Sequence, residues 1–299
     1  MIKRWLLRTS SVMVVLLVGL GVFAWVRSAS LLQRAWQVNE SPLVVPNDAT
    51  AIQRGHHLGV TRGCTDCHAA DMGGRVVVAN SPIGQLAAPN LTRGKGGVGA
   101  SLSVNDWEHA IRHGLRPDGR ALLLMPSDEM AALTDSDTAD LIAWLRQVPP
   151  VDRATPPSYV APLGRVLMAF GQLPLTAASR IDQHAVHQTS IVPMANAAYG
   201  AYLAHNCIGC HGARLSGGRI PGMPPQTPKA ANLTPDPGTG LGKWSKADFY
   251  RALREGQRPD GRALDPFMPW KTIGLSSDTE LDALWAYLRS VPPMPADQR

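Results

Sequence analysis

The residues best suited to chemistry in this chain are two pairs of cysteines, each followed directly by a histidine. The pentapeptides Cys64-Thr-Asp-Cys67-His68 and Cys207-Ile-Gly-Cys210-His211 contain all four cysteines of the 299-residue sequence. Cysteines three positions apart can form thioethers with the edge of a haem, and the adjacent histidine then reaches the iron. The pattern therefore predicts two covalently bound c-type haems. The attachment cysteines would be Cys64, Cys67, Cys207 and Cys210, and the proximal iron ligands His68 and His211.

Two other uses of paired cysteines explain the sequence less well. A zinc site built from the four cysteines leaves both histidines without a role, and the distance between the pairs exceeds the usual spacing of zinc modules. A thioredoxin-like motif needs a βαβ context, and no such pattern surrounds either pair. Haem attachment is the interpretation that uses all six residues.

The segments around the two motifs repeat each other. Residues 90–92 and 232–234 both read NLT, residues 114–122 (GLRPDGRAL) match 256–264 (GQRPDGRAL), and residues 141–150 (LIAWLRQVPP) match 284–293 (LWAYLRSVPP). The offset stays at 142 or 143, which indicates a duplicated domain and not a short-period solenoid. We expect one domain at residues 48–150 and a second at 195–295, each of normal size for one core.

The same duplication contains a candidate for the sixth iron ligand. Met125 and Met268 each precede a proline, and each follows the first cysteine of its own copy by 61 positions (64 to 125 and 207 to 268). A thioether is a soft ligand that suits low-spin haem iron and raises its reduction potential. Most methionines only fill cores, but these two coincide when the copies are aligned. We therefore predict Met125 and Met268 as distal ligands, with Met223 as the runner-up in the second copy.

The N-terminal segment has the composition of a membrane helix. Lys3, Arg4 and Arg8 precede an uncharged stretch from Thr9 to Val26, and Arg27 follows it. Such a stretch is near the lower limit for a span, and the preceding positive charges predict a cytoplasmic N-terminus with the rest exported. The alternative is a signal peptide cleaved at the small residues 28–30. Residues 1–30 are thus predicted as an uncleaved anchor or a signal peptide, and both place residues 31–299 in the periplasm.

The charge balance does not point to nucleic acid. Residues 1–40 hold five basic and one acidic side chain, which leaves +2 of the net charge of +6 for residues 41–299. No basic run with interleaved aromatic residues appears, so we expect no nucleic-acid partner.

Hydrophobic periodicity predicts an all-α fold with long loops, because no alternating strand pattern persists among the 28 glycines and 25 prolines. Helices are expected at residues 52–61 and 195–206, leading into the two cysteine motifs. Four further helices are expected to start at a serine or threonine with an acidic residue three positions later. These pairs are Ser103 with Asp106, Thr134 with Asp137, Ser245 with Asp248 and Ser277 with Glu280.

Three smaller features remain. Asn90 and Asn232 are predicted to form Asx turns, with a hydrogen bond across the haem pocket as the alternative. The repeated Pro-Asp-Gly segments are predicted to form turns, and the alternative is that their flanking arginines, Arg116 with Arg120 and Arg258 with Arg262, bind haem propionates. Residues 151–194 match nothing in the repeat and are interpreted as a connector. Its segment Arg165–Phe170 is too apolar for a free tether, so the connector is expected to pack on the domains.

The repeated motifs give the chain a resemblance to class I c-type cytochromes, in the tandem form found as electron-transfer subunits of membrane-bound alcohol and aldehyde dehydrogenases. The resemblance covers roughly residues 50–150 and 195–295. It rests on CxxCH, Asn-Leu-Thr, Gly-x-Arg-Pro-Asp-Gly-Arg, Met-Pro and a helix ending in Val-Pro-Pro. Those subunits typically look like three such domains, whereas this chain repeats the pattern twice.

The resulting hypothesis is a dihaem cytochrome c that passes single electrons on the periplasmic face of the cytoplasmic membrane and is not itself expected to be an enzyme. The donor would be a periplasmic dehydrogenase or a quinol-oxidising complex, and the acceptor a soluble cytochrome or a terminal oxidase. An alternative is a haem enzyme, a dihaem peroxidase or thiosulfate-oxidising cytochrome, which needs an open haem site. A structural subunit of a respiratory oxidase is a third interpretation.

Overall fold

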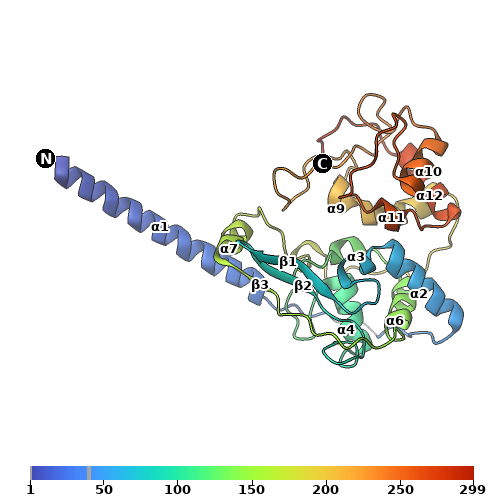
Figure 1. Ribbon diagram of the computed structural model, residues 1–299, viewed down its shortest axis with the longest axis horizontal. Coiled ribbons are helices and arrows are strands. Elements are labelled where there is room, and N and C mark those ends of the chain that lie inside the picture. The colour runs from blue at the N-terminus through green and yellow to red at the C-terminus, as the bar shows by residue number, and fades with distance from the viewer. Residues whose placement is uncertain (1, 39–41) are drawn as a thin grey trace.

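The computed structural model describes residues 2–38 and 42–299. Its most conspicuous element is α1 (Ile2–Gln33), a single long helix that projects from the folded body (Figure 1). Within the described residues, Ser10–Gln33 is the one stretch of helix with the length and apolar composition to cross a membrane, with a mean hydropathy of 2.1. The side chains from Val12 to Val26 are almost all exposed, which is the surface that lipid would cover.

The body consists of two halves with the same order of helices (Figure 1). The first half contains α2 (Ala49–Thr61), α3 (Cys64–His68), α4 (Val104–Glu108), the π-helix η1 (His109–His113), α5 (Ser127–Met130) and α6 (Asp135–Leu145). The second half contains α8 (Ala197–Ala204), the 3-10 helix η3 (His205–Cys207), α9 (Ile208–His211), α10 (Lys246–Glu255), α11 (Trp270–Ile273) and α12 (Asp278–Ser290). The predicted helices are confirmed, and α5 and α11 are short additions that the sequence did not indicate.

The predicted helix starts are also confirmed. Ser103, Ser245 and Ser277 each form a capping box with the acidic residue three positions later, and the Thr134 hydroxyl accepts from the backbone N–H of Asp137. Each cap satisfies backbone donors that have no partner within the helix.

Each half is built on one close helix crossing. Helix α2 packs against α6, and α8 packs against α12. At Gly55 and Gly200 an added Cβ would overlap the backbone carbonyl oxygen of Asp140 and Ala283, respectively. Only glycine lets the two backbones approach this closely. One hydrophobic core then runs through both halves and includes Trp107 and Leu141 of the first with Phe249 and Leu281 of the second.

The prediction of an all-α fold is wrong in one respect, because the first half carries a small antiparallel sheet. Strand β1 (Arg75–Ser81) pairs with β2 (Gly84–Ala88), which pairs with β3 (Tyr159–Val160). The run of valines at 76–78 has strand propensity. The edge strand β3 comes from the connector, so the full sheet depends on a long-range pairing that no local pattern reveals.

The connector packs on the body as expected, through α7 (Pro162–Ala169) and the 3-10 helix η2 (Ala178–Arg180). Met168, Leu173 and Leu175 form a second core with Leu86 of the sheet, and Leu31 and Leu32 at the end of α1 pack against it. Helix α1 is therefore joined to the body by a packed core, at the place where α7 lies in Figure 1.

Candidate haem sites

The two histidines of the cysteine motifs have the same environment. His68 and His211 are each 7% exposed, and their Nδ1 atoms lie 2.9 Å from the carbonyl oxygen of Pro89 and 2.7 Å from that of Ala231. Burial lowers the pKa of both imidazoles, so each ring is neutral. A neutral ring that donates Nδ1–H to a carbonyl keeps the lone pair of Nε2 for a metal, which is the usual second interaction of a metal-ligating histidine. The site therefore fits haem iron on the proximal side.

The cysteines lie on the same short helical turns as the histidines. Helix α3 begins at Cys64, and Cys207 is the residue before α9. All four cysteine side chains are partly buried and none of them is in a disulfide, and burial raises the pKa of the Cys64 and Cys207 thiols to about 12. After each histidine the chain turns back in the same way, because the carbonyls of His68 and His211 accept from Gly74 and Gly217.

The repeated Asn-Leu-Thr segments hold the carbonyls that orient the histidines. Asn90 and Asn232 directly follow Pro89 and Ala231, and the side-chain oxygen of each asparagine accepts from the backbone N–H and the hydroxyl of the threonine two positions later. Their amide groups donate to carbonyls after the last helix, those of Val151 and Arg153 for Asn90 and of Met294 for Asn232. The predicted Asx turns are confirmed. Their further role in positioning the histidine was not foreseen.

The repeated Pro-Asp-Gly segments are turns, as predicted. Asp118 pairs with Arg120 and Asp260 with Arg262, both at the surface. The turn of the first half also contacts the segment that follows α1, because the Trp36 N–H donates to the Gly119 carbonyl.

Met125 and Met268 occupy matching places in the two halves. Both are partly buried, and each is followed by a proline that precedes a short helix, α5 or α11. Met268 packs against the main core, whereas Met223, the runner-up, is 38% exposed. Ligation of iron by Met125 and Met268 remains a prediction.

The structure also brings the cysteine motif of each half against the Met-Pro helix of the other, which sequence reasoning missed. The Thr272 hydroxyl at α11 donates to the Asp66 carboxylate between Cys64 and Cys67, at 3.2 Å. Helix α5 contacts η3, and the Glu129 carboxylate lies against Gly209. Burial raises the pKa of Glu129 to about 7. The two candidate haem sites are therefore neighbours across the interface between the halves.

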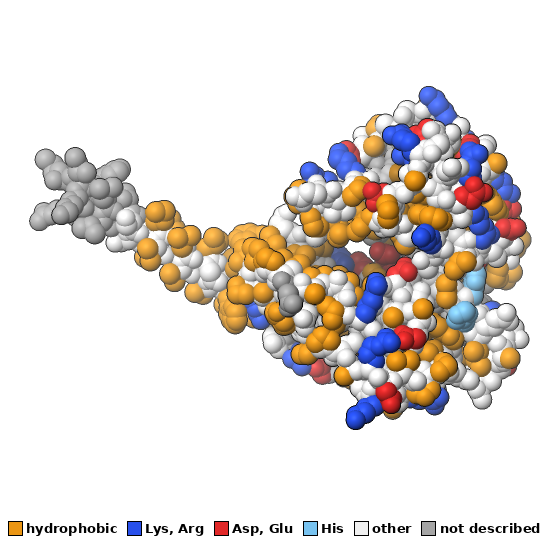
Figure 2. All heavy atoms as spheres, viewed as in Figure 1, with side chains coloured by type: hydrophobic (Ala, Val, Ile, Leu, Met, Phe, Trp, Pro, Cys, Tyr) orange, Lys and Arg blue, Asp and Glu red, His pale blue; other side chains and the backbone are white. Residues whose placement is uncertain are grey.

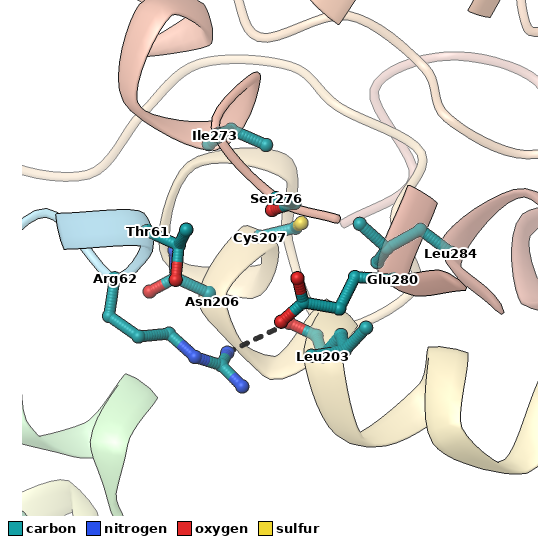
Figure 3. Close-up of a pocket in the computed structure, with 9 residues that line it drawn as sticks. All are labelled: Thr61, Arg62, Leu203, Asn206, Cys207, Ile273, Ser276, Glu280 and Leu284. Carbon is teal, nitrogen blue, oxygen red and sulfur yellow. Dashed lines mark hydrogen bonds between the residues drawn. The ribbon is translucent and has the colours of Figure 1, made fainter. Parts of the chain in front are cut away.

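A pocket lies at this interface and includes Cys207, one of the candidate attachment cysteines. Figure 3 shows Thr61 and Arg62 of the first half opposite Cys207 and Glu280 of the second. Arg62 is 8% exposed and its Nη1 donates to the Leu203 carbonyl at 3.0 Å, while Nη2 has no hydrogen-bond partner among the residues that the structure describes. A buried cation thus stands two residues before Cys64 and beside Cys207.

Comparison with known proteins agrees with this geometry. The cytochrome c family model matches residues 197–292. The chain is 28% identical over 262 residues to the fructose dehydrogenase cytochrome subunit of Gluconobacter japonicus, covering 81% of this chain and 53% of that subunit. It is 30% identical over 290 residues to the cytochrome c subunit of a quinone-dependent alcohol dehydrogenase of Gluconacetobacter polyoxogenes, covering 84% and 58%. A dihaem c-type cytochrome of Cereibacter sphaeroides is 28% identical, covering 80% and 85%.

The second half of the chain is a cytochrome c domain with the helical fold of that family. The chain as a whole resembles the cytochrome c subunits of fructose and alcohol dehydrogenases and a dihaem cytochrome c. It spans little more than half the length of those dehydrogenase subunits.

Proposed function

We propose that the protein is a membrane-anchored dihaem cytochrome c that transfers single electrons. The observation that carries the proposal is the matched pair of buried histidines, each beside a cysteine pair and each held through Nδ1 by a backbone carbonyl. Bound haem supplies the one-electron chemistry, and the chain supplies its ligands and its orientation. The haem domains are residues 48–150 and 195–295, joined by the connector 151–194. The iron ligands are His68 with Met125 and His211 with Met268.

The anchor is residues 1–30, and the packing of α1 supports its retention in the mature protein. Ala24 and Ser28 are 2% and 0% exposed, and the Arg27 guanidinium donates to the Ala169 carbonyl at 3.2 Å. Cleavage at residues 28–30 would cut α1 inside this packed region. Lys3, Arg4 and Arg8 orient the N-terminus to the cytoplasm, which places the haem domains in the periplasm.

The partner that supplies electrons is a dehydrogenase, by analogy with relatives named as cytochrome subunits of fructose, alcohol and gluconate dehydrogenases. The acceptor is a soluble cytochrome or a terminal oxidase. The contact of each cysteine motif with the Met-Pro helix of the other half supports a short relay, in which one haem receives the electron and the other delivers it.

The test is to count haems in the full-length protein purified from membranes. We expect two covalent haems per chain, one after Cys64→Ser/Cys67→Ser and one after Cys207→Ser/Cys210→Ser. Intact mass measures the haem count, and the N-terminal sequence shows whether residues 1–30 are retained. A single haem in the unmodified protein would disprove the dihaem assignment, and stoichiometric carbon monoxide binding as isolated would favour the haem enzyme.

A further inference from the structure

The surface where α1 joins the body carries an apolar stripe that α1 does not cover. Leu163 and Val166 of α7 and Phe170, the residue that caps it, are 47%, 37% and 48% exposed. Their spacing of three and four positions places them on one face of the helix. The other face, with Gly164 and Met168, is buried. Helix α7 is thus largely apolar on both faces, and one of these faces is turned to the outside of the molecule.

This face continues the exposed apolar surface of α1. The rings of Phe23 and Phe170 contact each other with centroids 5.9 Å apart. Figure 2 shows apolar side chains extending from α1 onto the adjoining body. The stripe and the candidate membrane span therefore form one continuous apolar surface. If lipid covers α1 at Phe23, the same lipid also reaches α7.

The position along α1 sets the depth of this contact. The uncharged stretch ends at Val26, and Arg27 and Ser28 are the residues that bond to α7. A stretch of about 20 residues crosses the hydrocarbon region, so α7 lies at its outer boundary. The Arg165 guanidinium stacks over the exposed Trp25 ring at 4.1 Å. An aromatic ring with an arginine is typical of the membrane interface.

We propose that α7 is a second membrane contact: an interfacial helix that inserts Leu163, Val166 and Phe170 among the outer-leaflet lipids beside α1. A helix lying in the interface buries its exposed apolar side chains a few ångströms below the headgroups. The proposal rests on the membrane anchor proposed above. It adds that the body is held against the bilayer at two points and does not hang from a flexible stalk.

Accessibility of a spin label distinguishes the lipid from water at each position. In the haem-loaded protein all four native cysteines are consumed by thioethers, so a nitroxide can be attached at Val166→Cys or Phe170→Cys alone. The matched control is Val186→Cys, also in the connector and 98% exposed. Leu16→Cys, in the middle of α1, reports on the anchor. The proteins are reconstituted in phosphatidylcholine–phosphatidylglycerol vesicles and measured with both haems oxidised, because a reductant would destroy the nitroxide. The ratio of oxygen to nickel collisions at one label cancels relaxation caused by the haem iron.

The measured quantity is the ratio of collisions with oxygen to collisions with a water-soluble nickel complex. We expect this ratio to be several-fold higher for labels at 166 and 170 than for the label at 186. Labels at 166 and 170 that behave like the label at 186, while the label at 16 is in lipid, would overturn the interfacial role of α7 and leave the anchor intact. A label at 16 that is in water would instead disprove the anchor, and with it this inference. An unchanged haem spectrum confirms that each variant is folded.

Discussion

The imidazole Nε2 of His57 lies 2.8 Å from the carboxylate of Glu280, 223 positions away in the chain. His57 belongs to α2 of the first half, and Glu280 to the first turn of α12 in the second. A corresponding pair joins α8 of the second half to α6 of the first. There the Tyr202 hydroxyl donates to the Asp137 carboxylate in the first turn of α6. His57 and Tyr202 each follow by two positions the glycine at which their helix crosses its partner.

The His57–Glu280 pair makes the interface sensitive to pH. The hydrogen bond to Glu280 raises the pKa of His57 above its ordinary value of 6.5, against the opposing effect of burial. Folding therefore favours the protonated ring. Its contribution to the free energy of unfolding is complete below pH 6.5 and is lost as the pH rises through the raised pKa. Guanidinium titrations from pH 5 to 9 should show a deficit in His57→Gln that shrinks as the pH rises.

The control is His184→Gln, which changes an exposed histidine of the connector. The buried histidines of the two motifs are common to all these proteins and cancel in the comparison. A deficit in His57→Gln that is constant over the whole pH range would show that the pair does not titrate as described.

Replacement of one methionine ligand should open the sixth coordination position of one haem iron. If Met268 is the distal ligand, Met268→Ala should abolish half of the weak far-red sulfur-to-iron absorption. It should also allow one haem to bind carbon monoxide and lower its reduction potential, because a ligand that favours ferrous iron is lost. Absorption spectra and a redox titration measure these changes. Met223→Ala is the control. An intact far-red band in Met268→Ala would remove Met268 from the ligand set.

The close crossing of α8 and α12 should not tolerate a methyl group. In Gly200→Ala the new Cβ overlaps the Ala283 carbonyl, so the helices must separate, at a cost of about 1–3 kcal/mol as for other overpacked sites. In the matched control Gly238→Ala, the nearest atom is Asp236 Oδ2 at 3.4 Å, an ordinary contact. For Gly200→Ala, denaturant titrations should give a free energy of unfolding that is well below that of Gly238→Ala. Equal stabilities would mean that the helices are not packed as the structure has them.

The buried charge of Arg62 should raise the reduction potential of the haems beside it. Burial raises the pKa of the Cys64 and Cys207 thiols, and the Arg62 charge opposes this at both positions, so it acts on both candidate attachment sites. A nearby cation disfavours ferric iron. Arg62→Gln should therefore lower both midpoint potentials, and Arg62→Lys should retain most of the effect. Arg146→Gln, at the surface, is the control; potentials in Arg62→Gln that match it would contradict this role.

The sequence predicted best what is encoded locally. The cap at Ser103, for example, needs only Asp106 three positions later, and the structure contains it. The interface between the halves was not predictable, because no local pattern in the sequence indicates that His57 and Glu280 are in contact. The sheet falls between these cases: the valines at 76–78 carried a signal for β1, but β3 pairs with β2 from a segment about 75 positions away.

The duplicated contacts have a consequence for how the halves stay together. Each half offers equivalent positions to the other, which is how the two subunits of a symmetric dimer meet. Here both partners belong to one polypeptide, so their association is intramolecular and does not weaken on dilution. The residues with which one half could pair with a second molecule already bind the other half of the same chain. The two halves thus meet as the subunits of a symmetric dimer do, in a ratio of one to one that the covalent chain fixes.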